Sequence, residues 1–115
     1  MAYTQGDLVI VRFPYTDLSD YKPRPAMIVS NYSVNKSGDY TVVMITSQNV
    51  ESVFRSVISN GDVSVNFRPP HSEMNINCKK IAVLNGSVIA KKISKITNMD
   101  LLDEVLEKIK SPFIR

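Results

Sequence analysis

The chain has 115 residues, of which 43% are hydrophobic, enough for one domain whose core needs no disulfide, and we expect a single domain over residues 1–115. Fourteen Lys and Arg against eleven Asp and Glu give a formal charge of +3, a mild bias that suits a polyanion but is common among ordinary proteins. One cysteine cannot form an internal bridge, and no leader-like or membrane-length apolar segment is present, so secretion and membrane insertion are not expected and the cytoplasm is the expected compartment.

In chain order, three apolar segments of the first half predict short strands. They cover residues 6–13, 25–30 and 40–46, and each is rich in β-branched side chains. Polar stretches separate them, at residues 15–23 and 31–39, and these favour surface loops. The third strand runs out into Thr46, Ser47 and Gln48, small polar groups at a strand end that a ligand could use.

Arg24 stands between Pro23 and Pro25 at the beginning of the second of these strands. Each proline fixes its own φ and restricts the residue before it to extended geometry, so the directions of Lys22 and Arg24 are nearly predetermined. A guanidinium held in this way suits a phosphate or a carboxylate, because its planar fork donates paired hydrogen bonds. Taken without the rest of the chain, the segment favours a simpler alternative, a stiff turn whose arginine caps a strand edge.

The second half of the chain predicts further strands and one helix. Residues 54–58 and 62–67 flank Asn60-Gly61, a dipeptide typical of a tight hairpin turn. Residues 68–75 predict a proline-stiffened loop, and the alternation over residues 78–93 predicts another strand pair, with Asn85-Gly86 either at its turn or within a strand bend.

From Asn98 onward the apolar period changes to that of an amphipathic helix, with Thr97 or Asn98 as its cap and Pro112 beyond its end. Many short strands joined by polar loops and closed by one helix predict a mainly β, α+β domain with a strongly bent sheet or barrel, because closure removes exposed sheet edges.

Several segments together resemble the MazF/PemK family of toxin endoribonucleases from bacterial type II toxin-antitoxin modules. They are Gly6-Asp7-Leu8-Val9, the segment from Phe13 to Asp17, Arg24-Pro25-Ala26 running into Met27 to Ser30, Ile45-Thr46-Ser47-Gln48, and the tail from Cys78 to Ile93 with the helix after it. Their order and spacing match as well. The resemblance implies a small SH3-like barrel of the CcdB/PemK type that forms homodimers.

The resemblance also implies an activity: metal-independent, sequence-specific cleavage of single-stranded RNA, which inhibits translation and growth, with silencing by a cognate antitoxin and no cofactor. DNA would be bound only through the antitoxin complex. Carried over by position, the family's catalytic arginine and threonine match Arg24 and Thr46. The implied RNA contacts are Thr16, Asp20, Lys22, Ser47 and Gln48. One departure is Lys79-Lys80, where relatives often have an acidic residue first, and this affects base preference.

The residues give little support to serine-hydrolase, metal-dependent or histidine-dependent chemistry. Thr46 and Ser47 have no serine-hydrolase setting around them, and one histidine with one cysteine does not make a metal-ligand cluster. Cys78 is expected to be a small buried hydrophobe. His71 has the side chain best suited to proton transfer near neutrality, but it matches no catalytic position, and we expect no catalytic role for it. A barrel that binds RNA or a peptide without cutting it is the alternative function.

Overall fold

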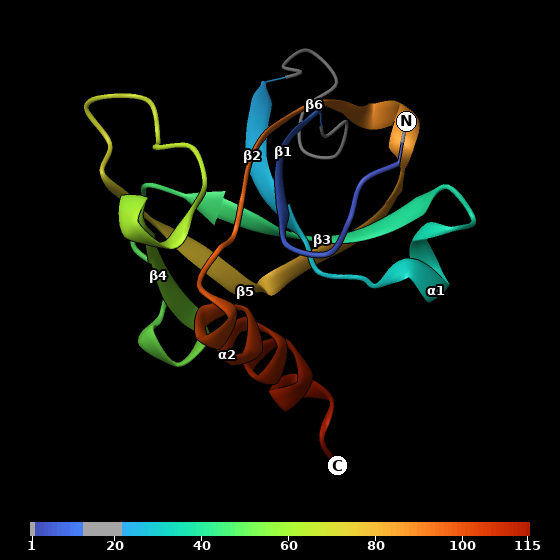
Figure 1. The fold of residues 1–115 in the computed structure, drawn as a ribbon. Helices are drawn as coiled ribbons and strands as arrows, with labels where there is room; N and C mark the ends of the chain where they lie inside the picture. The colour runs from blue at the N-terminus through green and yellow to red at the C-terminus, as the bar shows by residue number, and fades with distance from the viewer. Residues whose placement is uncertain (1, 13–21) are drawn as a thin grey trace.

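The computed structural model describes residues 2–12 and 22–115, and within them six antiparallel strands form one sheet that a C-terminal helix covers (Figure 1). The strand order is β4-β5-β3-β2-β1-β6. The elements are β1 Asp7–Arg12, β2 Pro23–Ile28, α1 Tyr32–Asn35, β3 Asp39–Thr46, β4 Arg55–Ser59, β5 Glu73–Asn85, β6 Ile89–Lys95 and α2 Met99–Lys110. The expected class, mainly β with a closing helix, is confirmed. None of the described helices has the length and apolar character needed to cross a membrane.

The central strands are buried on both faces, and their successive apolar side chains point to opposite sides of the sheet. The first core lies between the sheet and α2 and includes Leu8, Val43 and Val105. The second core lies on the other face and includes Val9, Ala26 and Val42. Strands buried on both faces read as continuous apolar runs, which is why β1 and β3 could be recognised from the sequence.

Helix α2 begins where the sequence predicted it. The side chain of Asn98 accepts hydrogen bonds from the backbone N–H groups of Asp100 (3.1 Å) and Leu101 (3.3 Å), so it satisfies donors that the first turn leaves unpaired. Its amide also donates to the carboxylate of Asp62 at 2.9 Å, and this bond is the largest of the effects that lower the pKa of Asp62. Asn98 therefore connects the helix to the segment after β4.

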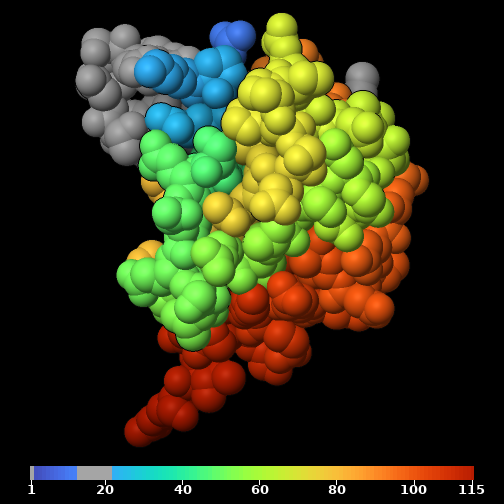
Figure 2. Space-filling view, turned by 90° about the vertical axis from the view of Figure 1, so that its left-hand side faces the viewer, coloured from blue at the N-terminus to red at the C-terminus, as the bar shows by residue number. Residues whose placement is uncertain are grey.

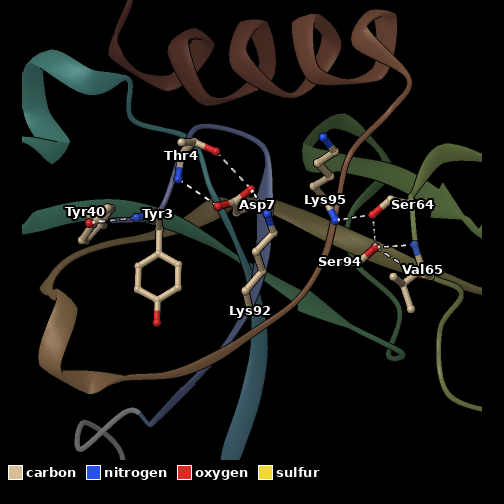
Figure 3. Close-up of polar contacts among 9 residues, drawn as sticks. All are labelled: Tyr3, Thr4, Asp7, Tyr40, Ser64, Val65, Lys92, Ser94 and Lys95. Carbon is tan, nitrogen blue, oxygen red and sulfur yellow. Dashed lines mark hydrogen bonds and ion pairs between the residues drawn. The ribbon is translucent and has the colours of Figure 1, made fainter. Parts of the chain in front are cut away.

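The segment that follows β4, at one edge of the sheet, bonds to β6 at the other edge, so the sheet curls into a barrel-like form. Val63 and Ile96 form an isolated antiparallel bridge, and the N–H of Ser64 donates to the carbonyl of Lys95 at 2.9 Å. The buried hydroxyl of Ser94 accepts from the N–H of Val65 at 2.9 Å (Figure 3). These contacts cover part of the open edge of β6, as the expected barrel requires.

A second polar group fixes the beginning of the sheet. The carboxylate of Asp7 is buried and accepts from the N–H and the hydroxyl of Thr4 at 2.9 and 3.1 Å, and Lys92 of β6 lies 3.2 Å from it (Figure 3). A buried carboxylate is tolerated only when it is paired and hydrogen-bonded in this way. Asp7 thus joins β1 to β6 and holds the N-terminal segment against the sheet.

The predicted hairpin around Asn60-Gly61 is wrong. Residues 60–62 form a 3₁₀ turn instead, in which Ser59 and Asp62 make a reciprocal capping box, and neither Asn60 nor Gly61 has the positive φ that a type I′ turn needs. Residues 62–67 are no strand beside β4, because residues 63–65 bond to β6 across the barrel. The tertiary contact with β6 has overridden the local turn preference.

The strand pair expected within residues 78–93 is also wrong, although both segments are strands. β5 starts earlier than predicted, at Glu73, and pairs with β3 and β4, whereas β6 pairs with β1 at the opposite edge of the sheet. Asn85-Gly86 leads into a 3₁₀ turn between β5 and β6. The loop expected at residues 31–39 contains the single-turn helix α1, which Asn31 caps.

Candidate active site

The candidate site lies where β2 begins and β3 ends, at the rim of the second core. Ala26 and Met44 are partners across the two strands, and both belong to that core. Arg24 precedes Ala26 by two residues and Thr46 follows Met44 by two, so both side chains project on the same face of the sheet as the core. Arg24 lies within β2 rather than in a turn before it, and this disfavours the stiff-turn interpretation.

A cleft of about 290 Å³ opens at this rim. Figure 2 faces the side of the molecule on which the beginning of β2 (light blue), the end of β3 with the segment after it (green) and β5 (yellow to gold) adjoin. Of the residues predicted to act, the cleft brings together Arg24, Thr46 and Gln48. The full described lining is Arg24, Met44, Ile45, Thr46, Gln48, Asn49, Val50, Asn77 and Lys80.

The other predicted RNA contacts are not part of this lining. Ser47, next to Gln48, and Lys22, next to Pro23, are both exposed. Neither residue lines the cleft. Thr16 and Asp20 lie outside the described residues, so their placement stays a prediction. The structure therefore groups three of the predicted residues and leaves four to be tested.

Hydrogen bonds hold the wall of the cleft that follows β3. The hydroxyl of Thr46 accepts from the backbone N–H of Gln48 at 3.1 Å, and the Asn75 amide donates to the carbonyl of Gln48 at 2.9 Å. Both backbone groups of Gln48 are thus bonded, so the main chain from which its side chain projects is held in place. The hydroxyl of Thr46 keeps its own O–H to donate to a ligand.

The electrostatic character of the cleft is positive. Arg24 and Lys80 both line it, and none of the described lining residues carries a carboxylate. The exposed Arg24 guanidinium makes no hydrogen bond or ion pair with any residue of the described parts of the chain. A cleft with two cations and several amide and hydroxyl groups suits a phosphodiester better than an apolar ligand.

Sequence reasoning missed Asn49, Asn77 and Lys80 as parts of the site. Asn77 is a β5 residue that pairs with Met44 of β3 and with Arg55 of β4, so only the strand order brings it to the cleft. The sequence connects the pair Lys79-Lys80 with base preference but does not show which of the two lies at the site. No local signal distinguishes Lys80 from Lys79.

Two other groups that could carry chemistry lie elsewhere. Cys78 belongs to the first core and is 1% exposed, as expected, and burial raises the pKa of its thiol, so the unreactive protonated form is favoured. His71 is exposed in the loop before β5 and does not line the cleft. Among the side chains that the structure describes, no three His, Cys, Asp or Glu residues gather in a possible metal site.

Two larger hollows, of about 360 and 380 Å³, lie at the opposite end of β3. Both include Tyr3 and Tyr40, whose rings meet edge to face at 5.6 Å and whose N–H and hydroxyl groups are bonded at 3.1 Å (Figure 3). Neither includes an arginine, and the Tyr3–Tyr40 contact is satisfied within the fold. Volume alone does not make them better candidates than the cleft.

The family model described as the PemK-like, MazF-like toxin of type II toxin-antitoxin systems matches residues 4–113. The chain belongs to this family. The match covers both strands that carry Arg24 and Thr46, and it confirms the resemblance on which those two residues were selected. A comparison with curated protein sequences finds no significant match.

Solved structures of this toxin family share the fold at low sequence identity. A MazE-MazF crystal structure from Deinococcus radiodurans has a TM-score of 0.71 at 20% identity and covers 98% of this chain and 97% of its own. An endoribonuclease in complex with its cognate antitoxin from a mycobacterial species has 0.70 at 15%, covering 97% and 95%. The Mycobacterium tuberculosis toxin MazF-mt6 has 0.70 at 16%, covering 93% and 95%. The expected PemK-type barrel is therefore confirmed.

Proposed function

We propose that this PemK/MazF family member is a sequence-specific, metal-independent endoribonuclease that cleaves single-stranded RNA and thereby inhibits translation and growth. The observation that carries the proposal is the cleft in which Arg24 of β2 and Thr46 of β3 converge without a neighbouring carboxylate among the described lining residues. A barrel that merely bound RNA or a peptide would not need this pair at the ends of two adjacent strands.

The reaction uses a nucleophile that RNA itself carries. The 2′-hydroxyl attacks the adjacent phosphorus, an O2′–P bond forms and the P–O5′ bond breaks; the 2′-hydroxyl loses its proton, and the departing 5′-oxygen gains one. The enzyme has to align these atoms and stabilise the charge that develops on the phosphoryl oxygens. We assign that stabilisation to Arg24, because the planar fork of its guanidinium matches the oxygens of a phosphate.

Thr46 completes the pair as the group that holds the phosphate or the 2′-hydroxyl in line. Its hydroxyl is positioned by the N–H of Gln48, which it accepts at 3.1 Å. We propose that the Gln48 side chain contacts an RNA base, together with Ser47, Lys22, Thr16 and Asp20 as further RNA contacts. The residue proposed to read a base is thus joined to the proposed catalytic threonine through its backbone N–H.

Cleavage of a long unstructured RNA should persist in excess EDTA and should leave a 5′-hydroxyl together with a 2′,3′-cyclic or 3′ phosphate. The expectation follows from a 2′-hydroxyl nucleophile and from roles that Arg24 and Thr46 can fill without a metal. End-labelling of the fragments with and without phosphatase treatment identifies the termini. A 5′-phosphate product would rule out this mechanism, and RNA binding without cleavage would favour the non-catalytic alternative.

We further propose that the chain forms a homodimer and is silenced by a cognate antitoxin. The support is family membership and the two relatives whose structures are a MazE-MazF complex and an endoribonuclease with its cognate antitoxin. Contact with DNA would occur only through the antitoxin complex. Sedimentation equilibrium at assay concentration should give twice the 12.9 kDa chain mass. A fully active monomer would contradict the dimer.

The functional unit that we propose is the single domain over residues 1–115. It is supported by the pairing of β1, near the beginning of the chain, with β6, near its end, which makes the sheet depend on both halves. We place the protein in the cytoplasm, because its proposed mRNA substrate is found there. A reducing compartment also suits its single unpaired cysteine.

A further inference from the structure

We propose that Lys80 is a second phosphate-binding cation of the cleft, that it contacts the phosphate next to the scissile one, and that it sets RNA affinity rather than the chemical step. This inference rests on the proposed function, since it concerns the same cleft. Its neighbour Lys79 is excluded from the role by the same structural feature that places Lys80 there.

That feature is a bulge in β5. Val43 of β3 pairs with Ile81, but the next residue, Met44, pairs with Asn77, so Cys78, Lys79 and Lys80 have no partners on β3. A bulge bends its strand and changes the direction of the side chains that follow. Here it reverses the alternation of β5 between the two faces of the sheet.

The reversal is seen in which β5 residues belong to each core. Ile76, before the bulge, and Cys78, its first residue, are even-numbered and lie in the first core, whereas the odd-numbered Ile81 packs there after the bulge. Ala82 and Leu84 consequently face the second core. Lys80 precedes Ala82 by two residues and so projects on the face of the second core, at whose rim the cleft opens.

Lys79 points to a different set of groups. Its ammonium lies 3.2 Å from the carboxylate of Glu51 and 5.3 Å from the centre of the Phe54 ring, and it does not line the cleft. Its charge is thus partly neutralised by a carboxylate. Lys80 shares its lining with Arg24 and with no carboxylate among the described residues.

The positions of the two cleft cations suit one strand of RNA. Arg24 lies on β2 and Lys80 on β5, and these strands flank β3, which ends with Thr46 between them. Strands two apart in a sheet are separated by about 10 Å, so the two cations are better placed for neighbouring phosphates than for one. A lysine ammonium acts on a phosphate as a point charge, and such contacts contribute affinity that falls with salt.

The test compares Lys80→Gln with the adjacent Lys79→Gln, and uses Lys80→Arg to restore the charge. The probe is a fluorescein-labelled 2′-O-methyl RNA, which cannot be cleaved, and Kd is measured by anisotropy between about 50 and 200 mM KCl. Lys80→Gln should weaken binding about tenfold at the low-salt end and reduce the slope of log Kd against log salt by about 0.7. Lys79→Gln should change Kd by less than about twofold and leave the salt slope unchanged.

Single-turnover cleavage at saturating RNA should fall less than about threefold in Lys80→Gln, because the effect is on binding. An unchanged salt slope in that variant, an equal effect in Lys79→Gln, or a hundredfold loss at saturation would each overturn the inference. The binding measurement does not depend on cleavage. A parent protein that shows the Lys80 contribution but cuts no RNA would therefore contradict the proposed function and leave the phosphate-binding role of Lys80 standing.

Discussion

Arg24→Lys should fold like the parent protein and lose about a hundredfold to a thousandfold in single-turnover RNA cleavage, the range observed when one preorganised donor to a developing charge is removed. The charge is retained in this variant, but the planar fork is not, and an ammonium on a flexible stem cannot present two parallel donors to the phosphoryl oxygens. Arg24 is exposed at the beginning of β2, so the substitution leaves both cores intact. The thermal unfolding midpoint should accordingly match that of the parent.

His71→Ala is the matched control for this experiment. His71 is exposed and lies outside the cleft lining, and among the described residues its one bonded group is the backbone N–H, which donates to the carbonyl of Arg68 at 3.1 Å. We expect turnover within about threefold of the parent at each pH from about 5 to 9. Near-normal turnover of Arg24→Lys, or a hundredfold loss in His71→Ala, would each refute our assignment of the chemistry.

Gly6→Ala should reduce the free energy of unfolding by about 2–4 kcal/mol, the largest loss of stability that we expect from adding one methyl group to this chain. Gly6 has a φ of +92°, a backbone conformation that costs an L-residue about 1–2 kcal/mol. A Cβ at this position would also lie 2.7 Å from Cγ2 of Ile96, which is in the first core. Urea unfolding of the parent and the variant measures the difference.

The backbone around Gly6 has little freedom to relax. Its N–H donates to the carbonyl of Ile28 at 2.8 Å, and its carbonyl accepts from the N–H of Ile96 at 2.9 Å, so it joins the end of β2 to the residue after β6. Gly38→Ala is the control, because Gly38 has nearly the same φ of +91° but its nearest neighbour, Nδ2 of Asn85, is 4.0 Å away. It should lose about 1–2 kcal/mol. Equal losses in the two variants would show that the contact with Ile96 costs nothing.

The elements that the sequence predicted correctly are those whose pattern depends on a single chain segment. β1, β3 and α2 each combine a clear apolar pattern with local boundary signals, among them Pro14 after the first strand and Asn98 before the helix. Asn60-Gly61 carries an equally local signal, yet its residues form a 3₁₀ turn, because the chain after them bonds to β6. A local turn preference of about 1 kcal/mol is outweighed by several tertiary hydrogen bonds of this kind.

For the candidate site, the sequence by itself determined the chemical types of Arg24, Thr46 and Gln48 and their location at strand ends, and their family resemblance selected them. What only the tertiary structure decided is the assembly of the cleft: the order β5-β3-β2 brings Asn77 beside Met44, and the β5 bulge separates Lys80 from Lys79. The physical reason is that side chains of a strand alternate with a period of two, so an unpaired segment that shifts this phase reverses every later assignment to a face. Neither Lys79 nor Lys80 reveals that shift in the sequence, because the shift arises from the register that β5 adopts against β3.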